Sequence, residues 1–248
     1  MGIGWTDLGG ALLLTLAGLA ILAAIVGLLV WDARRRKSPS VILEVTGAVA
    51  RMWLALTVLA AGLTIWRWLS AVDTWVAGVP VALVWPETLP CEQTVPPEPT
   101  ATTALWCANA PAADLTITVL SAGAKVMLAL GELLTLVVIA MPAVLLVVVC
   151  REALRGTPFA RIAGRWLVIA AVVVLAAGLG GGLAGDIGRA MAAAEVLPPS
   201  TSDAAVTATG IYRLTVPLWP IGAAVALWAL GAVFRHGAAL HRDVRGLV

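Results

Sequence analysis

Glu132 is an acidic residue inside a long apolar stretch, where ionisable side chains are rare unless they are paired or functional. Arg67, Asp186 and Arg213 flank other apolar stretches on what we expect to be the same side of a membrane. We therefore predict an ion cluster of these four residues in the outer half of the membrane, in its simplest form a structural pair of Glu132 with Arg67. The alternatives are a proton or ion route through Glu132, and an acid that reaches outward to the membrane surface.

The rest of the sequence offers no constellation typical of catalysis or metal binding. It contains neither an HExxH nor a GxSxG motif, and no two carboxylates stand at helical spacing to work as a pair. His236 and His241 are five positions apart, so on a helix they would point about 140° apart and make poor co-ligands. We therefore expect no catalytic residue, no metal site and no cofactor, and a protein that is not an enzyme.

The composition indicates an integral membrane protein, because 61% of the residues are apolar and only 12% are charged. Apolar stretches close to the length of about 20 residues that a span needs cover residues 8–31, 46–68, 126–150, 166–185 and 214–234. The predicted fold is an all-α polytopic membrane protein with five transmembrane helices. Its segments are a first helix with a basic flank (1–37), a second span (38–70), an outer segment (71–125) and the last three spans (126–248).

Positive charge is distributed unevenly among the connections between these spans. The segments expected inside the cell hold twelve of the 16 Lys and Arg residues: Arg34, Arg35, Arg36, Lys37, Arg51, Arg151, Arg155, Arg161, Arg165, Arg235, Arg242 and Arg245. By the positive-inside rule, the N-terminus lies outside and the C-terminus inside. Basic inner segments also attract the anionic headgroups of membrane lipids.

The outer segment contains Cys91 and Cys107, sixteen positions apart. Two cysteines outside the cytoplasm usually pair, and closing such a loop stabilises a protein by about 3 kcal/mol. Alternating and β-branched residues at 79–85, 115–120 and 206–216 are typical of strands. The residues fit two structures equally well, a small sheet with the disulfide loop at the tip of a hairpin, and an irregular loop on the membrane surface.

The glycine-rich stretch "GLGGGLAG" lies inside the predicted fourth span. No GK[ST] follows it, as a phosphate-binding loop would require. Gly178 with Gly182, and Gly181 with Gly185, are small residues four apart, which let two helices approach closely in lipid. These glycines predict helix packing.

The chain ends in an amphipathic, basic stretch that we expect to be helical. Leu240 and Leu247 fall on one face, whereas Arg235, Arg242 and Arg245 gather on roughly the other. Such a helix either lies on the inner membrane surface with its arginines toward headgroups or binds a cytoplasmic protein.

Two short motifs carry a resemblance to a known family. The inner loop reads "RGTPF", with Gly156, Pro158 and Phe159, and the chain ends in "GAALHRDVRGLV". From about residue 48 to the end, the sequence resembles the bacterial membrane-protein family catalogued as domain of unknown function 2975 (DUF2975). The matching terminal residues are Gly237, Leu240, Asp243, Leu247 and Val248. Unlike the four-helix members of that family, this chain has an extra first helix and an enlarged outer loop.

The resemblance implies a multi-pass protein of the bacterial inner membrane, from a family with no established activity. Members are often encoded beside a small helix-turn-helix regulator, which implies a non-enzymatic sensor or scaffold for a cytoplasmic partner such as that regulator, with no direct binding of nucleic acid. The surface expected to hold this partner or lipid comprises Arg151, Arg155, Gly156, Pro158, Phe159, Arg161, Arg165, Arg235, Leu240, Arg242, Asp243 and Arg245. The alternatives are a structural or accessory subunit of a larger membrane complex and, less favoured, a small transporter or channel.

We expect Cys91 and Cys107 to be joined in whole cells, because both lie in the predicted outer segment. A membrane-impermeant thiol reagent should label them only after reduction, and external protease should leave the final residues intact. A Cys91→Ser variant is the control, since Cys107 should then react without reductant. Labelling only after the cells are permeabilised would reverse the predicted topology.

Overall fold

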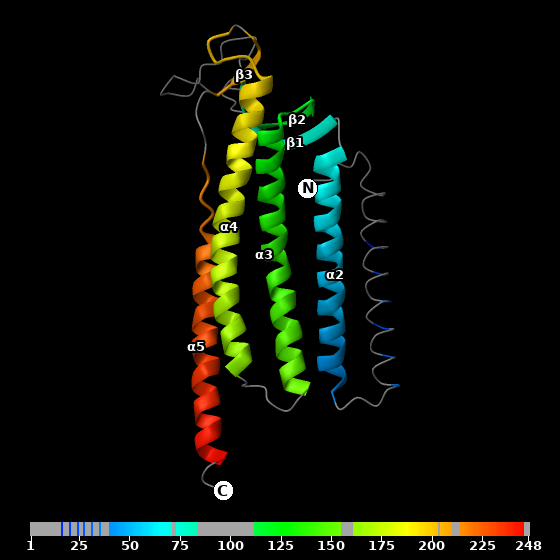
Figure 1. Cartoon of the computed structure of the whole chain (residues 1–248), viewed down its shortest axis with the longest axis vertical. Helices are drawn as coiled ribbons and strands as arrows, with labels where there is room; N and C mark the ends of the chain where they lie inside the picture. The colour runs from blue at the N-terminus through cyan, green and yellow to red at the C-terminus, as the bar shows by residue number, and fades with distance from the viewer. Residues whose placement is uncertain are drawn as a thin grey trace, which may run out of the picture. The chain divides into compact units, whose positions relative to one another are not determined.

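The computed structural model describes residues 40–70, 73–83, 112–154, 161–202, 204–209 and 214–245, together with positions 16, 20, 24, 27, 31 and 35. The structure is mostly helical with a small sheet (Figure 1). Its elements are α2 (Val41–Ser70), β1 (Asp73–Leu83), β2 (Ala112–Thr118), α3 (Ala122–Leu154), α4 (Arg161–Val196), β3 (Val206–Ala208) and α5 (Trp219–Arg245).

Three of these helices, α2, α3 and α4, are long and apolar enough to cross a membrane. They contain 30, 33 and 36 residues, well above the minimum of about 20 for a span. Within the described ranges, no further helix meets the same requirement of length and composition. Most of the predicted first span lies outside the described residues, although the isolated positions 16 to 31 that are described are helical.

The predicted fifth span is wrong at its start. Residues 214–217 have no regular secondary structure, and α5 begins only at Trp219. Pro217 and Pro220 explain the difference, because proline lacks the backbone N–H that a helix interior needs and is accommodated best in the first helical turn. Pro220 occupies the second position of α5. The helix then continues through the basic stretch to Arg245, as the terminal pattern predicts.

The helix that contains the predicted fourth span does not end with it, because α4 continues eleven residues past Gly185, to Val196. Hydropathy falls at Asp186, but the sequence that follows is rich in alanine and keeps a high helix propensity. Pro198 and Pro199 lie just beyond the end of the helix, where proline prevents its continuation. Asp186 therefore lies within α4 rather than at its end.

The sheet has the strand order β2-β1-β3, and both pairs are antiparallel. Its presence confirms the sheet that the alternating residues predict, although β1 begins earlier than expected and β3 is only three residues long. A β-bulge lies between Val76 and Val79, which pair with Leu115 and Ala113. Gly78 in the bulge has a φ of 70°, a conformation that glycine adopts at little cost, and its N–H donates to Asp114 Oδ1 at 2.9 Å.

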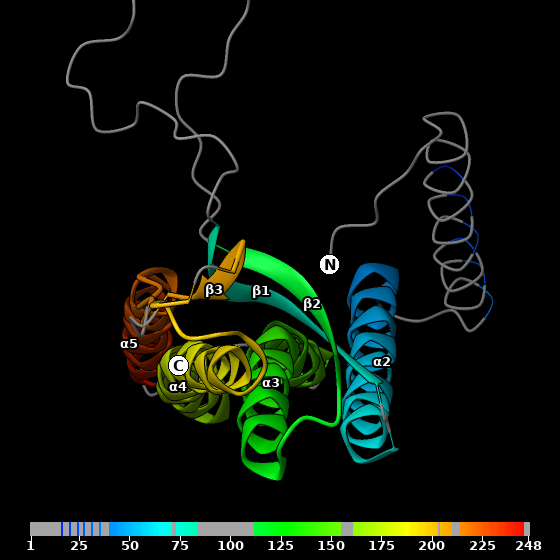
Figure 2. The same cartoon turned by 90° about the horizontal axis from the view of Figure 1, so that it is seen from above.

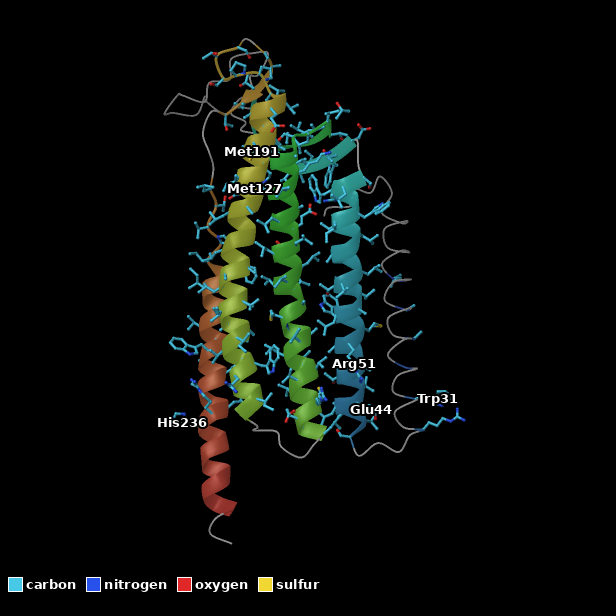
Figure 3. The ribbon with its side chains drawn as sticks, in the orientation of Figure 1. Trp31, Glu44, Arg51, Met127, Met191 and His236 are labelled. Carbon is cyan, nitrogen blue, oxygen red and sulfur yellow. The ribbon has the colours of Figure 1, made fainter. Side chains whose placement is uncertain are left out.

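The chain forms two compact units. Unit 1 comprises residues 1–58, 139–174 and 222–248, and unit 2 comprises residues 59–138 and 175–221. In unit 2, the sheet packs beside the first turns of α3 and the last turns of α4 (Figure 2). The core that they share consists of Trp68, Val76, Val79, Ile117, Leu120, Ala124, Leu128, Ala192 and Ala193. Met191 packs against this core (Figure 3), and its Cε lies 3.1 Å from the place of a Cβ on Gly123.

Within unit 1, the same helices make a second set of close contacts. The indole of Trp53 on α2 donates to the Ile139 carbonyl of α3 at 3.2 Å. Gly164 of α4 faces Gly231 of α5, since a Cβ on Gly164 would lie 3.5 Å from the Gly231 carbonyl oxygen. Cys150 is a buried free thiol, as expected from its position in the sequence.

The backbones of α3 and α4 come into direct contact in unit 2. A Cβ added to Gly131 would lie 2.9 Å from the Gly185 nitrogen and 3.1 Å from the Gly181 carbonyl oxygen. One added to Gly181 would lie 3.2 Å from the Leu134 Cβ. Close approach of backbones is a main source of helix association in lipid, where apolar contact alone gives little driving force. Gly181 and Gly185 therefore share a partner on α3 that the sequence pattern did not single out.

The other two glycines of the predicted packing stretch face a different neighbour. A Cβ on Gly178 would lie 2.7 Å from the side chain of Pro220, and one on Gly182 would lie 3.4 Å from Pro217. The four glycines thus serve two faces of α4, one toward α3 and one toward the start of α5.

We expect Gly131→Ala to destabilise the protein by about 1–3 kcal/mol, because the new methyl group would overlap the backbone of α4 and force the helices apart. The matched control is Gly62→Ala on α2, where a Cβ would meet nothing within 4 Å, and where alanine should favour the helix by about 1 kcal/mol or less. Unfolding of the purified proteins in detergent measures both changes. Equal stability of the two variants would contradict the contact.

Candidate functional site

Arg67 and Glu132 form an ion pair between α2 and α3. The Arg67 Nη2 lies 2.6 Å from Oε1 and 2.7 Å from Oε2 of the carboxylate. The Trp68 indole N–H donates to the same carboxylate at 3.2 Å, and the Arg67 guanidinium lies over the Trp68 ring, 5.1 Å from its centre. The structure therefore brings together the two residues that the sequence suggests as the simplest pair, and adds an indole donor.

The elements around this pair explain its position. Arg67 lies in the last turn of α2, where a positive charge interacts favourably with the helix dipole. Glu132 lies one helical turn beyond Leu128, which belongs to the core beside the sheet. Trp68 is itself a buried member of that core. The ion pair thus joins α2 to α3 at the border of the core, with both charged side chains about 40% exposed.

Asp186 belongs to a different set of interactions. Its Oδ1 accepts from Arg189 Nη2 at 2.5 Å, and its Oδ2 accepts from the Thr215 N–H at 2.6 Å. In the part of the chain that the structure describes, these are its partners, and it does not join Glu132. The physical reason is local: because α4 continues past Gly185, Arg189 lies three positions further on the same helix face. Arg213, the fourth predicted member, lies outside the described residues.

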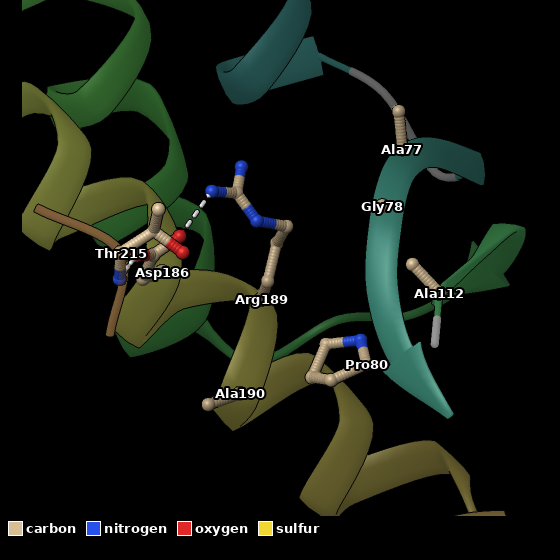
Figure 4. A pocket seen from close by; sticks show the side chains of 8 residues that line it. All are labelled: Ala77, Gly78, Pro80, Ala112, Asp186, Arg189, Ala190 and Thr215. Atoms are coloured by element: carbon tan, nitrogen blue, oxygen red, sulfur yellow. Dashed lines mark hydrogen bonds and ion pairs between the residues drawn. The ribbon is translucent and has the colours of Figure 1, made fainter. Parts of the chain in front are cut away.

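An open pocket of about 370 Å³ adjoins Asp186 and Arg189 (Figure 4). Its lining comes from α4, from the bulged part of β1, from the start of β2 and from the segment before α5: Ala77, Gly78, Pro80, Ala112, Asp186, Arg189, Ala190 and Thr215. The guanidinium of Arg189 lies above Gly185, where a Cβ would come within 3.3 Å of it. The absence of a side chain at Gly185 therefore makes room for Arg189, while the missing side chain of Gly131 makes room for the backbone of α4 at Gly185.

The first turn of α3 is tied to the end of α4 by a cap. The Ser121 hydroxyl accepts from the Ala124 N–H at 3.3 Å and donates to Glu195 Oε1 at 2.5 Å. The Ser121 N–H donates to the other carboxylate oxygen of Glu195 at 3.1 Å. This arrangement resembles a capping box, except that the acid comes from another helix.

The residues predicted as the inner partner surface are described in part. The side chains of Arg151, Arg165 and Arg235 are exposed in unit 1, and the stem of Arg235 packs against Gly164, its Cγ lying 3.2 Å from the place of a Cβ there. The backbone is helical at Arg161, Leu240, Arg242, Asp243 and Arg245, whose side chains are outside the described part. The remaining residues of this surface lie outside the described ranges: Arg155, Gly156, Pro158 and Phe159. The two cysteines of the predicted outer disulfide, Cys91 and Cys107, also lie outside these ranges.

Comparison with known proteins adds no relative. No family model, no curated protein and no solved structure matches the chain. Fold and sites together define a mostly helical protein with a small sheet and three helices compatible with membrane spans. The resemblance to the domain of unknown function 2975 stays a prediction. Within the described residues, no group of three or more His, Cys, Asp or Glu is placed to hold a metal ion.

We expect Glu132→Gln to lower the stability in detergent by about 1–2 kcal/mol, because it leaves the Arg67 guanidinium without the carboxylate charge that it contacts at 2.6 Å. The companion variant Arg67→Gln breaks the same ion pair from the α2 side. Its matched control is Arg51→Gln, which removes the same charge from the same helix. Arg51 is exposed, and within the described residues it donates to the Gly47 carbonyl of its own helix (Figure 3).

The charge-swapped variant Arg67→Glu/Glu132→Arg tests the pairing itself. It should recover part of the stability lost in the single variants, although the Trp68 hydrogen bond to the carboxylate is lost. Melting temperatures followed by tryptophan fluorescence provide the measurement. If Glu132→Gln and Arg51→Gln melt alike, the ion pair does not stabilise the fold.

Proposed function

We propose that this chain is a five-span protein of the bacterial inner membrane, with its N-terminus outside and its C-terminus inside, that works by binding rather than by catalysis. It acts as a sensor or scaffold for a cytoplasmic partner, such as a small transcriptional regulator. In this proposal, α2, α3, α4, α5 and the apolar stretch at 8–31 are the spans. The sheet, closed by a Cys91–Cys107 disulfide, lies outside the cell.

The continuity of α3 and α4 is the observation that supports this function best. α3 carries the core residues Ala124 and Leu128 near one end and the exposed Arg151 near the other. α4 carries the exposed Arg165 near its start and the core residues Ala192 and Ala193 near its end. Each helix therefore contains both residues of the sheet core and a residue of the basic segment, with Pro142 in the interior of α3. A protein that couples an outer stimulus to an inner partner requires such shared elements.

Such coupling requires two conformations that the partner and the stimulus favour differently. The exposed Arg151, Arg165 and Arg235 offer positive charge to an acidic surface of the partner. The same charges also attract anionic headgroups, so lipid and protein would compete for one surface. Phosphorylation or folding of the partner could shift that competition without any reaction in the membrane protein.

A second function, as a subunit of a larger membrane complex, is favoured by the open surface of α2. Only 6% of its most apolar stretch is buried within the chain. Leu63 and Trp66 are largely exposed, and the side chains of Arg67 and Glu132 are also partly open. Lipid suits the apolar part of this face, whereas an exposed ion pair within a membrane is better satisfied by another protein.

Affinity purification of the intact protein from native membranes in mild detergent separates the two functions. For the sensor or scaffold, we expect a soluble regulator that is lost when residues 240–248 are deleted and when Arg151, Arg165 and Arg235 are replaced by Glu. For the subunit, we expect membrane proteins in fixed stoichiometry that survive these changes and are lost with Arg67→Gln. Arg51→Gln is the control for both. A protein that purifies alone in every case contradicts both functions.

A further inference from the structure

We propose that the pocket between α4 and β1 binds a phosphodiester group, with the guanidinium of Arg189 as its anion-binding side chain. This inference goes beyond the proposed function and does not depend on a cytoplasmic partner, since all lining residues belong to unit 2.

Arg189 is held by Asp186 through one of its nitrogens and has further N–H donors. A guanidinium has five N–H donors, and in the described residues the partner of Arg189 is Asp186, through Nη2. Figure 4 shows the other Nη on the side of the guanidinium away from Asp186, and Arg189 is one of the residues that line the pocket. The position of the Arg189 guanidinium is fixed before any ligand binds, because its partner Asp186 is only 10% exposed and accepts a hydrogen bond from the Thr215 N–H. Such pre-orientation reduces the entropy lost when a ligand binds.

The carboxylate of Asp186 orients Arg189. It does not act as a base or as a metal ligand. Both of its oxygens already accept a hydrogen bond, one from Arg189 and one from Thr215. Its charge still lowers the local positive potential. One guanidinium beside one carboxylate therefore suits an anion with a single charge better than a doubly charged one, and this favours a phosphodiester over a phosphate monoester.

The other lining residues leave room for such a group. Ala77, Gly78, Ala112 and Ala190 have no side chain beyond Cβ, and the bulge at Gly78 displaces the strand locally. The volume of about 370 Å³ lies at the lower end of the range of small-ligand pockets, and it accommodates a headgroup-sized ligand. Arginine binds phosphate oxygens through two parallel N–H bonds, which gives directionality as well as affinity.

The position along α4 suggests where the phosphodiester comes from. Asp186 and Arg189 are the first charged residues after the apolar stretch 166–185, so they lie where a span would leave the hydrocarbon and meet the headgroups. The same chemistry is offered by a lipid headgroup and by a soluble phosphodiester, and the experiment has to distinguish these sources.

The test uses the purified full-length protein in an uncharged detergent, with melting followed by tryptophan fluorescence. It is titrated with dimethyl phosphate, a diester without acyl chains, and with dihexanoylphosphatidylglycerol, each against sodium chloride at the same ionic strength. A ligand that binds the folded state raises the melting temperature in a saturable way. A rise with both ligands supports a site for any phosphodiester, and a rise with the lipid alone supports a headgroup site.

Two variants tie the response to this pocket. Arg189→Gln removes the donors, and Ala112→Leu fills the pocket while leaving the ion pair intact, so the test survives if the first variant folds poorly. Each should weaken the apparent affinity about tenfold or more. Gly62→Ala on α2, where a Cβ would meet nothing within 4 Å, is the control and should respond like the wild type. No saturable response, or a response that survives in both pocket variants, overturns the proposal.

Discussion

The contact between the backbones of α3 and α4 is the constraint on which the rest of unit 2 depends. In lipid, apolar side chains gain little by meeting one another, so helices associate through close backbone packing and polar contacts. Gly131 opposite Gly185 provides that approach. Because Glu132 and Asp186 are the next residues on the two helices, the contact also sets the level of both ion pairs. The sheet can pack on both helices only because their ends are held side by side.

Hydropathy predicts the parts of α2, α3 and α4 that are compatible with a membrane, but not their ends. A hydropathy pattern reports where lipid is tolerated, whereas helix ends depend on caps and prolines, here Ser121 at the start of α3 and Pro198 after α4. The strands follow the same logic. Alternation of Leu115 and Ile117 with threonines predicts residues 115–118 of β2, although the strand begins at Ala112 and ends at Thr118. The early start of β1 depends on its pairing with β2, which no local pattern encodes.

The sequence predicts which charged residues belong to the candidate site, but not all of their pairings. Opposite signs and similar depth suggest Glu132 and Arg67 as partners, but the rotation of each helix about its axis decides which charges meet. Arg189 was missed because the fourth helix was expected to end before it, and the i,i+3 spacing from Asp186 becomes informative only once α4 is known to continue. The pocket is lined by the sheet, by α4 and by the segment before α5, which are far apart in the sequence. No local pattern therefore predicts it.

The cap at Ser121 has a mechanical consequence. Because Glu195 holds both the hydroxyl and the N–H of Ser121, α3 cannot turn about its own axis near this end without breaking two hydrogen bonds to α4. The glycine contact lies about three turns further along α3, so the two helices are held together at two separate points. In unit 2, α2 is joined to this fixed pair of helices by the Arg67–Glu132 ion pair and by Trp68 in the core, so relative movement of α2 requires breaking fewer backbone contacts than separation of α3 from α4.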